Sequence, residues 1–100
     1  MSVFNLSQEE AFSSEHYVPK FLHSSDKVRV LLLCLDAGQE VPPHTSPEAT
    51  LYVVKGKGTI TVGEQPVPAE AGTLVVVDAG VNHAVKSQEQ MSLLVTIAAE

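Results

Sequence analysis

His44 and His83 are the residues of this chain whose type and setting best suit chemistry. Each follows a glycine and lies among residues that favour strands. Neutral imidazole nitrogens bind zinc, iron, nickel and copper. An imidazole also titrates near neutral pH, so that it can act as an acid or a base. If the fold brings the two rings together, the pair begins either a metal site or a metal-free polar site.

A metal site needs more ligands than two histidines supply. Catalytic zinc sites keep three protein ligands, and iron oxygenases use two histidines with one carboxylate. Glu48 is the nearest acidic residue to His44, and on one extended strand positions 44, 46 and 48 would share a face. His16 and His23 are further candidates from the N-terminal segment. One interpretation is therefore a divalent iron, zinc, nickel or manganese ion at His44, His83 and Glu48.

The other interpretation of the histidines needs no metal. Buried polar groups require hydrogen-bond partners. His44 and His83 would then line a pocket and bond to each other, to Ser46 or to water. Such a pair keeps its capacity for acid–base chemistry.

The elements that must position the histidines are short strands. From residue 28 onward, apolar or alternating runs are separated by glycine-containing turns; they cover residues 28–35, 50–54, 59–62, 73–77, 81–86 and 91–98. No helical crossover separates these runs, so the sheets are expected to be antiparallel, in a sandwich or barrel. Residues 1–27 are less regular. We expect them to form a packing arm with a single helical turn near residues 7–10.

Composition limits the class of protein. One hundred residues make one domain, and a hydrophobic share of 44% is too high for disorder. A net charge of −6 repels phosphate backbones, which argues against nucleic acid as a partner. The single cysteine, Cys34, cannot form a disulfide within the chain, and the longest uninterrupted apolar run, 30–35, cannot cross a bilayer. With no secretion signal at its start, the chain is expected to be cytoplasmic, without membrane contact.

Two spaced motifs of the chain resemble those of the cupin superfamily. The first motif is matched at Gly38, His44 and Gly56, and the second at Gly72, Gly80 and His83. The resemblance covers about residues 28–98. It implies an all-β double-stranded β-helix, or jelly-roll barrel, over residues 28–100, with residues 1–27 as the arm. It also implies that both histidines point into the mouth of the barrel.

The motifs also depart from the family pattern. The second histidine of the first motif is Ser46 here, and the glutamate falls on Ala49 or Thr50. In the second motif, Asp78 replaces a proline and Ser87 replaces an asparagine. Two of the four usual metal ligands are therefore matched, so that the metal can be absent.

The direction of the strand after His44 decides whether Glu48 can be a ligand. If this strand is aimed as in the family, Leu51 and Val53 point inward and Glu48 points outward. Only a bend at Pro47 would reverse this. The expected inward apolar set is Leu51, Val53, Ile60, Val62, Val75 and Val85.

The resemblance and the residues together suggest a small single-domain cupin that binds a small molecule in its barrel. The expected ligand contacts are Ser46, Leu51, Tyr52 and Val53. Two alternatives stay open: a metal-dependent dioxygenase or isomerase of the cupin type, and a structural or non-catalytic sensing module. A homodimer is expected, with contacts in residues 1–27 and 91–98, because a small sandwich leaves strand edges and apolar surface to cover.

Overall fold

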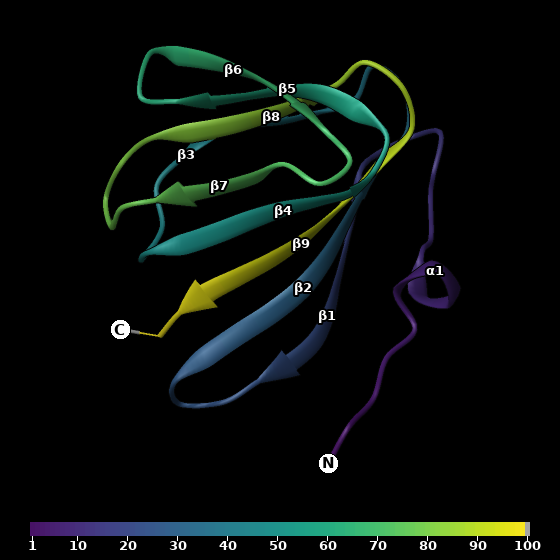
Figure 1. Cartoon of the computed structure of the whole chain (residues 1–100), viewed down its shortest axis with the longest axis vertical. Helices are drawn as coiled ribbons and strands as arrows, with labels where there is room; N and C mark the ends of the chain where they lie inside the picture. Colours follow the sequence, from purple (N-terminus) through teal and green to yellow (C-terminus); the bar gives the residue numbers. More distant parts are fainter. Residues whose placement is uncertain (100) are drawn as a thin grey trace.

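Two antiparallel sheets packed face to face make up the chain, as the computed structural model of residues 1–99 shows (Figure 1). The five-stranded sheet has the order β1 (Val18–Ser24), β2 (Val28–Leu35), β9 (Met91–Ala98), β4 (Ala49–Lys55) and β7 (Leu74–Val77). The four-stranded sheet has the order β3 (Glu40–His44), β8 (His83–Ser87), β5 (Lys57–Val62) and β6 (Gln65–Glu70). This is the expected all-β antiparallel jelly roll. Nothing helical within residues 1–99 has both the length and the apolar character that crossing a membrane requires.

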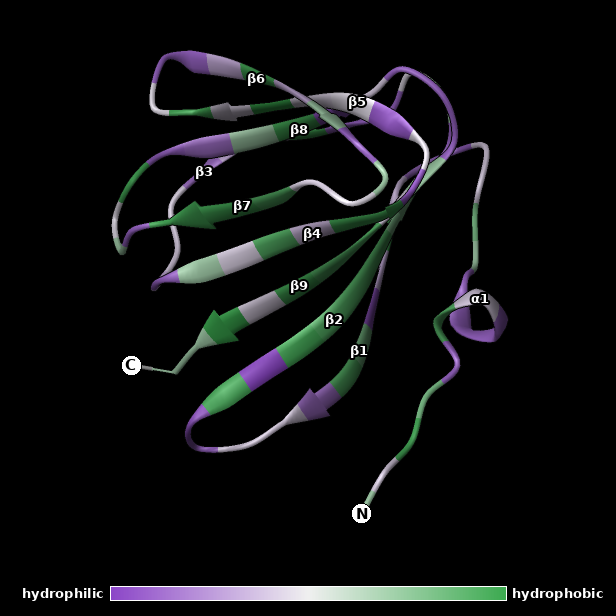
Figure 2. Ribbon diagram, viewed as in Figure 1, coloured by the Kyte–Doolittle hydropathy of each residue, from purple (hydrophilic) through white to green (hydrophobic). Residues whose placement is uncertain are grey.

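Side-chain alternation places the core between the two sheets. On β2, Leu31, Leu33 and Leu35 enter the core, while Leu32 and Cys34 are buried on the opposite face. An unbroken apolar run such as 30–35 is typical of a strand that is covered on both faces. The expected inward residues are also found there: Leu51, Val53, Ile60 and Val85 are buried, and Val62 and Val75 pack against them. Figure 2 shows the apolar residues concentrated along β2, β9, β4 and β7.

Much of the N-terminal segment lies against the outside of the five-stranded sheet. Its helical turn, α1 (Leu6–Glu9), begins one residue earlier than predicted, and the Asn5 side chain caps it by accepting from the Ser7 and Gln8 amides. Glu10 follows the turn, and its carboxylate accepts a hydrogen bond from Ser92 of β9. This contact attaches the segment to the middle of the sheet.

Strand β1 was not foreseen within residues 1–27. It pairs antiparallel with β2, with a register shift between Phe21 and His23. Pro19 lacks an N–H donor, so a strand that contains it is restricted to a sheet edge, which is where β1 lies. The segment is therefore part arm and part edge strand.

Gly56 joins β4 to β5, one strand from each sheet, and only glycine suits its position. Its φ is +82°, in the left-handed region, and an added Cβ would lie 2.7 Å from Cβ of Met91. The close approach to β9 explains why the first motif ends in a glycine.

Candidate functional site

His44 and His83 lie side by side at one end of the four-stranded sheet. They are register partners at the end of the β3–β8 ladder, and their ring centroids are 4.3 Å apart with an interplanar angle of 53°. A register shift between Val41 and His44, at the two prolines of β3, precedes the contact. The structure thus brings together two imidazoles that are far apart in the sequence.

Both imidazoles are held by the same kind of hydrogen bond. Nδ1 of His44 lies 2.9 Å from the Pro42 carbonyl oxygen, and Nδ1 of His83 lies 2.9 Å from that of Val81. A carbonyl oxygen can only accept, so each Nδ1 carries the proton. In the neutral ring, Nε2 is then left with its lone pair. The site therefore presents two fixed Nε2 acceptors.

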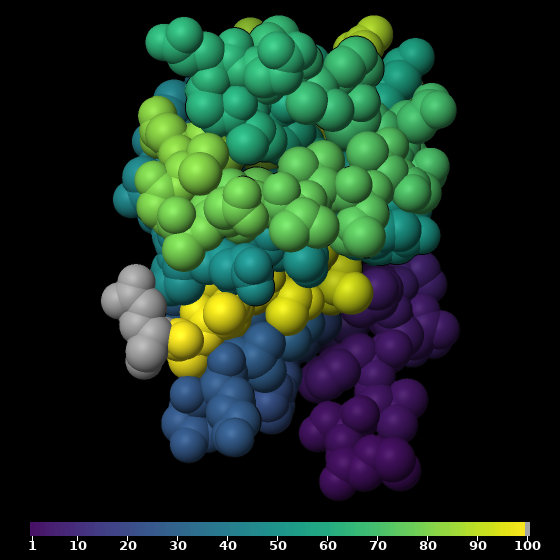
Figure 3. Space-filling view, turned by 60° about the vertical axis from the view of Figure 1, so that its left-hand side comes forward, coloured from purple at the N-terminus to yellow at the C-terminus, as the bar shows by residue number. Residues whose placement is uncertain are grey.

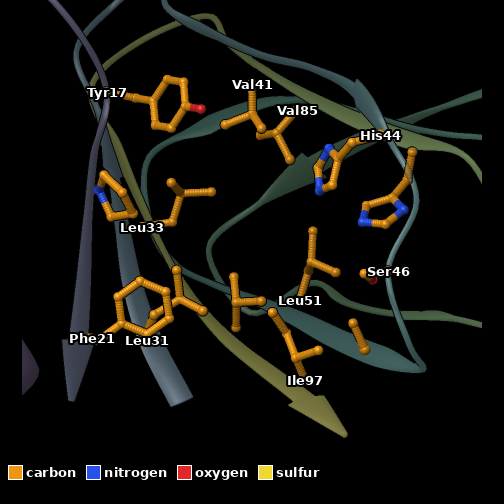
Figure 4. A pocket seen from close by; sticks show the side chains of 14 residues that line it. Tyr17, Phe21, Leu31, Leu33, Val41, His44, Ser46, Leu51, Val85 and Ile97 are labelled. Atoms are coloured by element: carbon orange, nitrogen blue, oxygen red, sulfur yellow. The ribbon is translucent and has the colours of Figure 1, made fainter. Parts of the chain in front are cut away.

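The rings form the polar end of a pocket of about 210 Å³ inside the barrel. His83 is buried, with 5% of its surface exposed, whereas His44 lies exposed at the mouth. In Figure 4, His44 and Ser46 lie at one end and Tyr17 and Phe21 on the opposite wall. Aliphatic side chains from both sheets line the pocket between these two ends; they include Leu31, Leu33, Val41, Leu51, Val85 and Ile97. The pocket is therefore apolar with one polar end, as ligand sites commonly are.

Among the expected ligand contacts, Ser46 and Leu51 line the pocket. The Ser46 hydroxyl donates to the Pro47 carbonyl at 2.8 Å, which leaves its oxygen free to accept. Tyr52 and Val53 are outside the pocket lining. Tyr52 neighbours Leu51 on the same strand and therefore points to the outer face, where it is 41% exposed. Val53 points inward but is fully buried deeper in the core.

The expected metal set of His44, His83 and Glu48 does not come together. Glu48 is exposed and borders a separate shallow pocket beside Lys27 and Thr96. Strand β4 begins directly after it with Ala49 buried, so alternation turns Glu48 away from the barrel interior. Pro47 does not bend the chain enough to reverse this.

The histidines of the N-terminal segment do not reach the site either. His16 is exposed and lies against the ring of Tyr17, with Nδ1 at 2.6 Å from the Tyr17 carbonyl oxygen. His23 lies in a groove with Met1 and Phe4. Over residues 1–99, no group of three histidine, cysteine, aspartate or glutamate side chains could hold a metal ion. The pocket thus fits a metal only as two ligands of an otherwise open site, fewer than the three that catalytic zinc takes.

The N-terminal segment contributes three residues to the pocket, Tyr17, Pro19 and Phe21, that were not expected there. All three belong to β1 or its start, and they repeat at intervals of two residues. This period is the signal of a strand with one face toward an apolar interior. It was available in the sequence, although it spans only three positions.

Comparisons with known proteins agree with this architecture. The family described as the cupin domain matches residues 31–97. An RmlC-like cupin protein from Desulfovibrio desulfuricans is 29% identical, with a TM-score of 0.91 over 98% of this chain and 96% of that one. A conserved protein of unknown function from Streptococcus pyogenes is 25% identical, with a TM-score of 0.88 over 99% of this chain and 88% of that one.

A protein from Thermus thermophilus, 22% identical, shares the fold with a TM-score of 0.93 over 99% of this chain and 98% of that one. No curated protein matches the chain. With the paired motifs, the two-sheet topology and a family match over more than half of its length, the chain belongs to the cupin domain family.

Proposed function

We propose that this protein binds a small organic molecule inside its barrel, with His44 and His83 as the polar contacts. The observation that carries the proposal is the pocket of about 210 Å³, lined by aliphatic and aromatic side chains, that ends at the two fixed imidazoles. Apolar pockets with a few convergent polar groups are the usual form of small-molecule sites. Binding without turnover, as in a sensing module, needs nothing further from the chain.

A pocket-filling variant tests this proposal. Ala49 is buried and lines the pocket, so that Ala49→Leu adds three carbon atoms to the space a ligand would take. Ala71 is exposed, which makes Ala71→Leu the matched control. A library of single-ring compounds should raise the melting temperature of the wild type and of Ala71→Leu, because a ligand that binds only the folded state stabilises it. The proposal fails if no compound stabilises the wild type, or if Ala49→Leu responds equally.

A metal-dependent dioxygenase or isomerase is the second candidate, and the hydrogen bonds of the two rings favour it. Histidines that bind metals usually donate their other ring N–H to a carbonyl or carboxylate, as His44 and His83 do here. A divalent iron, zinc, nickel or manganese ion at the two Nε2 atoms would leave its other positions to water or substrate. When bound, such an ion would supply Lewis-acid or redox chemistry.

Element analysis of the untagged protein, prepared anaerobically with added iron, tests whether the site binds a metal ion. This candidate expects one ion per chain, lost in both His44→Ala and His83→Ala and kept in the control His23→Ala. Anomalous X-ray scattering would locate the ion between the two rings. A folded wild type without metal after this preparation would exclude the candidate.

The outer face of β4 and β7 supports the proposal of a homodimer. Leu74 and Val76 are 59% and 57% exposed, and they pair across the ladder with Tyr52 and Thr50. Figure 3 shows β7 at the surface above β4 and β9, with the N-terminal segment (purple) at the lower edge of this face. The face is apolar and uncharged, and β7 is a sheet edge with unpaired backbone groups, so a second copy would cover both. Strand β9 lies between β2 and β4 and can contribute only outward side chains such as Leu94.

Light scattering on two lysine variants distinguishes a dimer contact at this face from one at the N-terminal segment. Val76→Lys should give a monomer, because a charge would be buried at the contact. Val3→Lys, on an apolar residue of the segment that is 82% exposed, should leave the dimer intact. If only Val3→Lys disrupts the dimer, the contact between the two copies lies in the N-terminal segment instead.

A further inference from the structure

The polar end of the barrel pocket offers hydrogen-bond acceptors. The N–H groups of His44 and His83 are already donated to backbone carbonyls, which leaves the two Nε2 lone pairs. The Ser46 hydroxyl hydrogen is likewise donated to the Pro47 carbonyl. A ligand with an O–H or N–H donor therefore finds partners here. A carboxylate or a ketone can only accept. While both rings are neutral, it finds no donor among these three groups and would lose its hydration without compensation.

The lining of the pocket also selects against charge. Among the described residues, no lysine, arginine, aspartate or glutamate lines it. With both imidazoles in the neutral form, an anion would thus enter an apolar space without a cation to pair with, and a cation would enter it without a carboxylate. The net charge of −6 further disfavours the approach of anions. The ligand that fits is uncharged.

The size of the pocket limits the ligand to about one ring. A cavity of about 150 Å³ holds benzene, and sites for drug-sized molecules begin at about 300 Å³. At about 210 Å³, this pocket takes a single ring with a small substituent. The rings of Phe21 and Tyr17, on the wall opposite the histidines, offer aromatic faces for that ring to pack against (Figure 4).

From these three observations we infer that the ligand is an uncharged, single-ring molecule with a hydroxyl group, of the class of substituted phenols. Its ring lies among the aliphatic side chains, and its O–H is donated to Nε2 of the His44–His83 pair. This inference rests on the proposed function of small-molecule binding and names the chemical class of the ligand.

Three ligands of matched shape test the class: 4-ethylphenol, ethylbenzene and 4-ethylbenzoate. Isothermal titration is carried out on the full chain after treatment with EDTA. One hydrogen bond is worth about fivefold to tenfold in affinity, so 4-ethylphenol should bind tighter than ethylbenzene by that factor. 4-Ethylbenzoate should bind more weakly than either. Long-range ¹H–¹⁵N spectra should show the phenol shifting an Nε2 resonance of the His44–His83 pair by a hydrogen bond that ethylbenzene cannot make.

A histidine variant tests whether the ligand's O–H group is bound by the His44–His83 pair. His44 is exposed, so His44→Leu should fold, and the loss of one of the two Nε2 acceptors should narrow the affinity difference between 4-ethylphenol and ethylbenzene. His23→Leu is the control and should change neither affinity. The inference is overturned if 4-ethylbenzoate binds tightest, or if phenol and ethylbenzene bind equally; in both cases small-molecule binding itself still stands. If none of the three ligands binds and the single-ring library also fails, the proposed function fails with it.

Discussion

The Ser92 hydroxyl donates to the Glu10 carboxylate at 2.6 Å, which joins β9 to the N-terminal segment across 82 positions of sequence. Ser92 is fully buried, and the Glu10 side chain, at 12% exposure, also lies 3.4 Å from the Lys55 ammonium. The outer face of the five-stranded sheet thus contains a buried polar contact where the N-terminal segment lies against it.

Removal of this acceptor should destabilise the fold. Glu10→Ala leaves the buried Ser92 hydroxyl without its partner, which should lower the free energy of unfolding by about 1–3 kcal/mol. Glu15→Ala, at an exposed position, should stay within about 0.5 kcal/mol of the wild type. Urea denaturation measures both. Equal values for the two variants would mean that the segment is held by apolar contacts alone.

Ser87, which stands where the family motif has an asparagine, is predicted to have a structural role. Its buried hydroxyl accepts from the Gln39 amide at 3.1 Å and donates to the Asp36 carbonyl, so it ties the end of β8 to the turn before β3. Ser87→Ala should cost about 0.5–1.5 kcal/mol of unfolding free energy, because it removes the hydrogen bonds of the hydroxyl, while the Gln39 amide keeps its bond to the Asp36 carbonyl. The exposed Ser24→Ala is the comparison for the same denaturation experiment. A cost no greater than that of Ser24→Ala would contradict the role.

Two glycine variants separate backbone strain from steric conflict. Gly56 and Gly63 both have positive φ, +82° and +62°, but only at Gly56 does an added Cβ meet the Met91 side chain. Gly63→Ala should cost about 1–2 kcal/mol through the left-handed conformation alone. Gly56→Ala should cost about 1–3 kcal/mol more, through the overpacking against β9. Thermal unfolding ranks them, and a reversed order would refute the steric explanation.

Burial raises the pKa of the Cys34 thiol above its usual value of 9.0, chiefly because the thiolate would lose its hydration; a backbone hydrogen bond from Ala11 opposes this. Below pH 9.0 the thiol is protonated in both states and stability does not depend on it. As the pH rises from 9.0 through the folded-state pKa, the unfolded chain loses its proton first, so stability falls.

The free energy of unfolding should therefore decline more steeply above pH 9.0 for the wild type than for Cys34→Ala. The thiol should also resist alkylation in the native protein and react once urea unfolds it, because it is 1% exposed. Rapid alkylation without denaturant would show that the cover over Cys34 opens readily.

Most strands from β2 onward could be predicted because their runs are apolar or alternate; β3 and β6, each of which contains two prolines, were not predicted. Leu51 and Val53 had to share a face, and their neighbour Tyr52 therefore had to point away from them. The same rule excluded Tyr52 from the pocket, although it was first included as a ligand contact. Tyr52 is close to the first motif in sequence, but its side chain points away from the pocket.

Glu48 shows the limit of sequence proximity more sharply. It is the nearest acid to His44 along the chain, yet β4 begins immediately after it and fixes its direction outward. Strand β1 was missed for a different reason. Its pairing depends on β2, its alternation spans few positions, and a proline and a register shift interrupt it.

The wall formed by Tyr17, Pro19 and Phe21 precedes residues 31–97, over which the cupin domain family matches. Barrels that share the two motifs therefore need not share the surface that faces their histidines. Under the proposed function, exchanging the segment equivalent to residues 17–21 between two such proteins should change the ligand preference and leave the rest of the barrel unchanged.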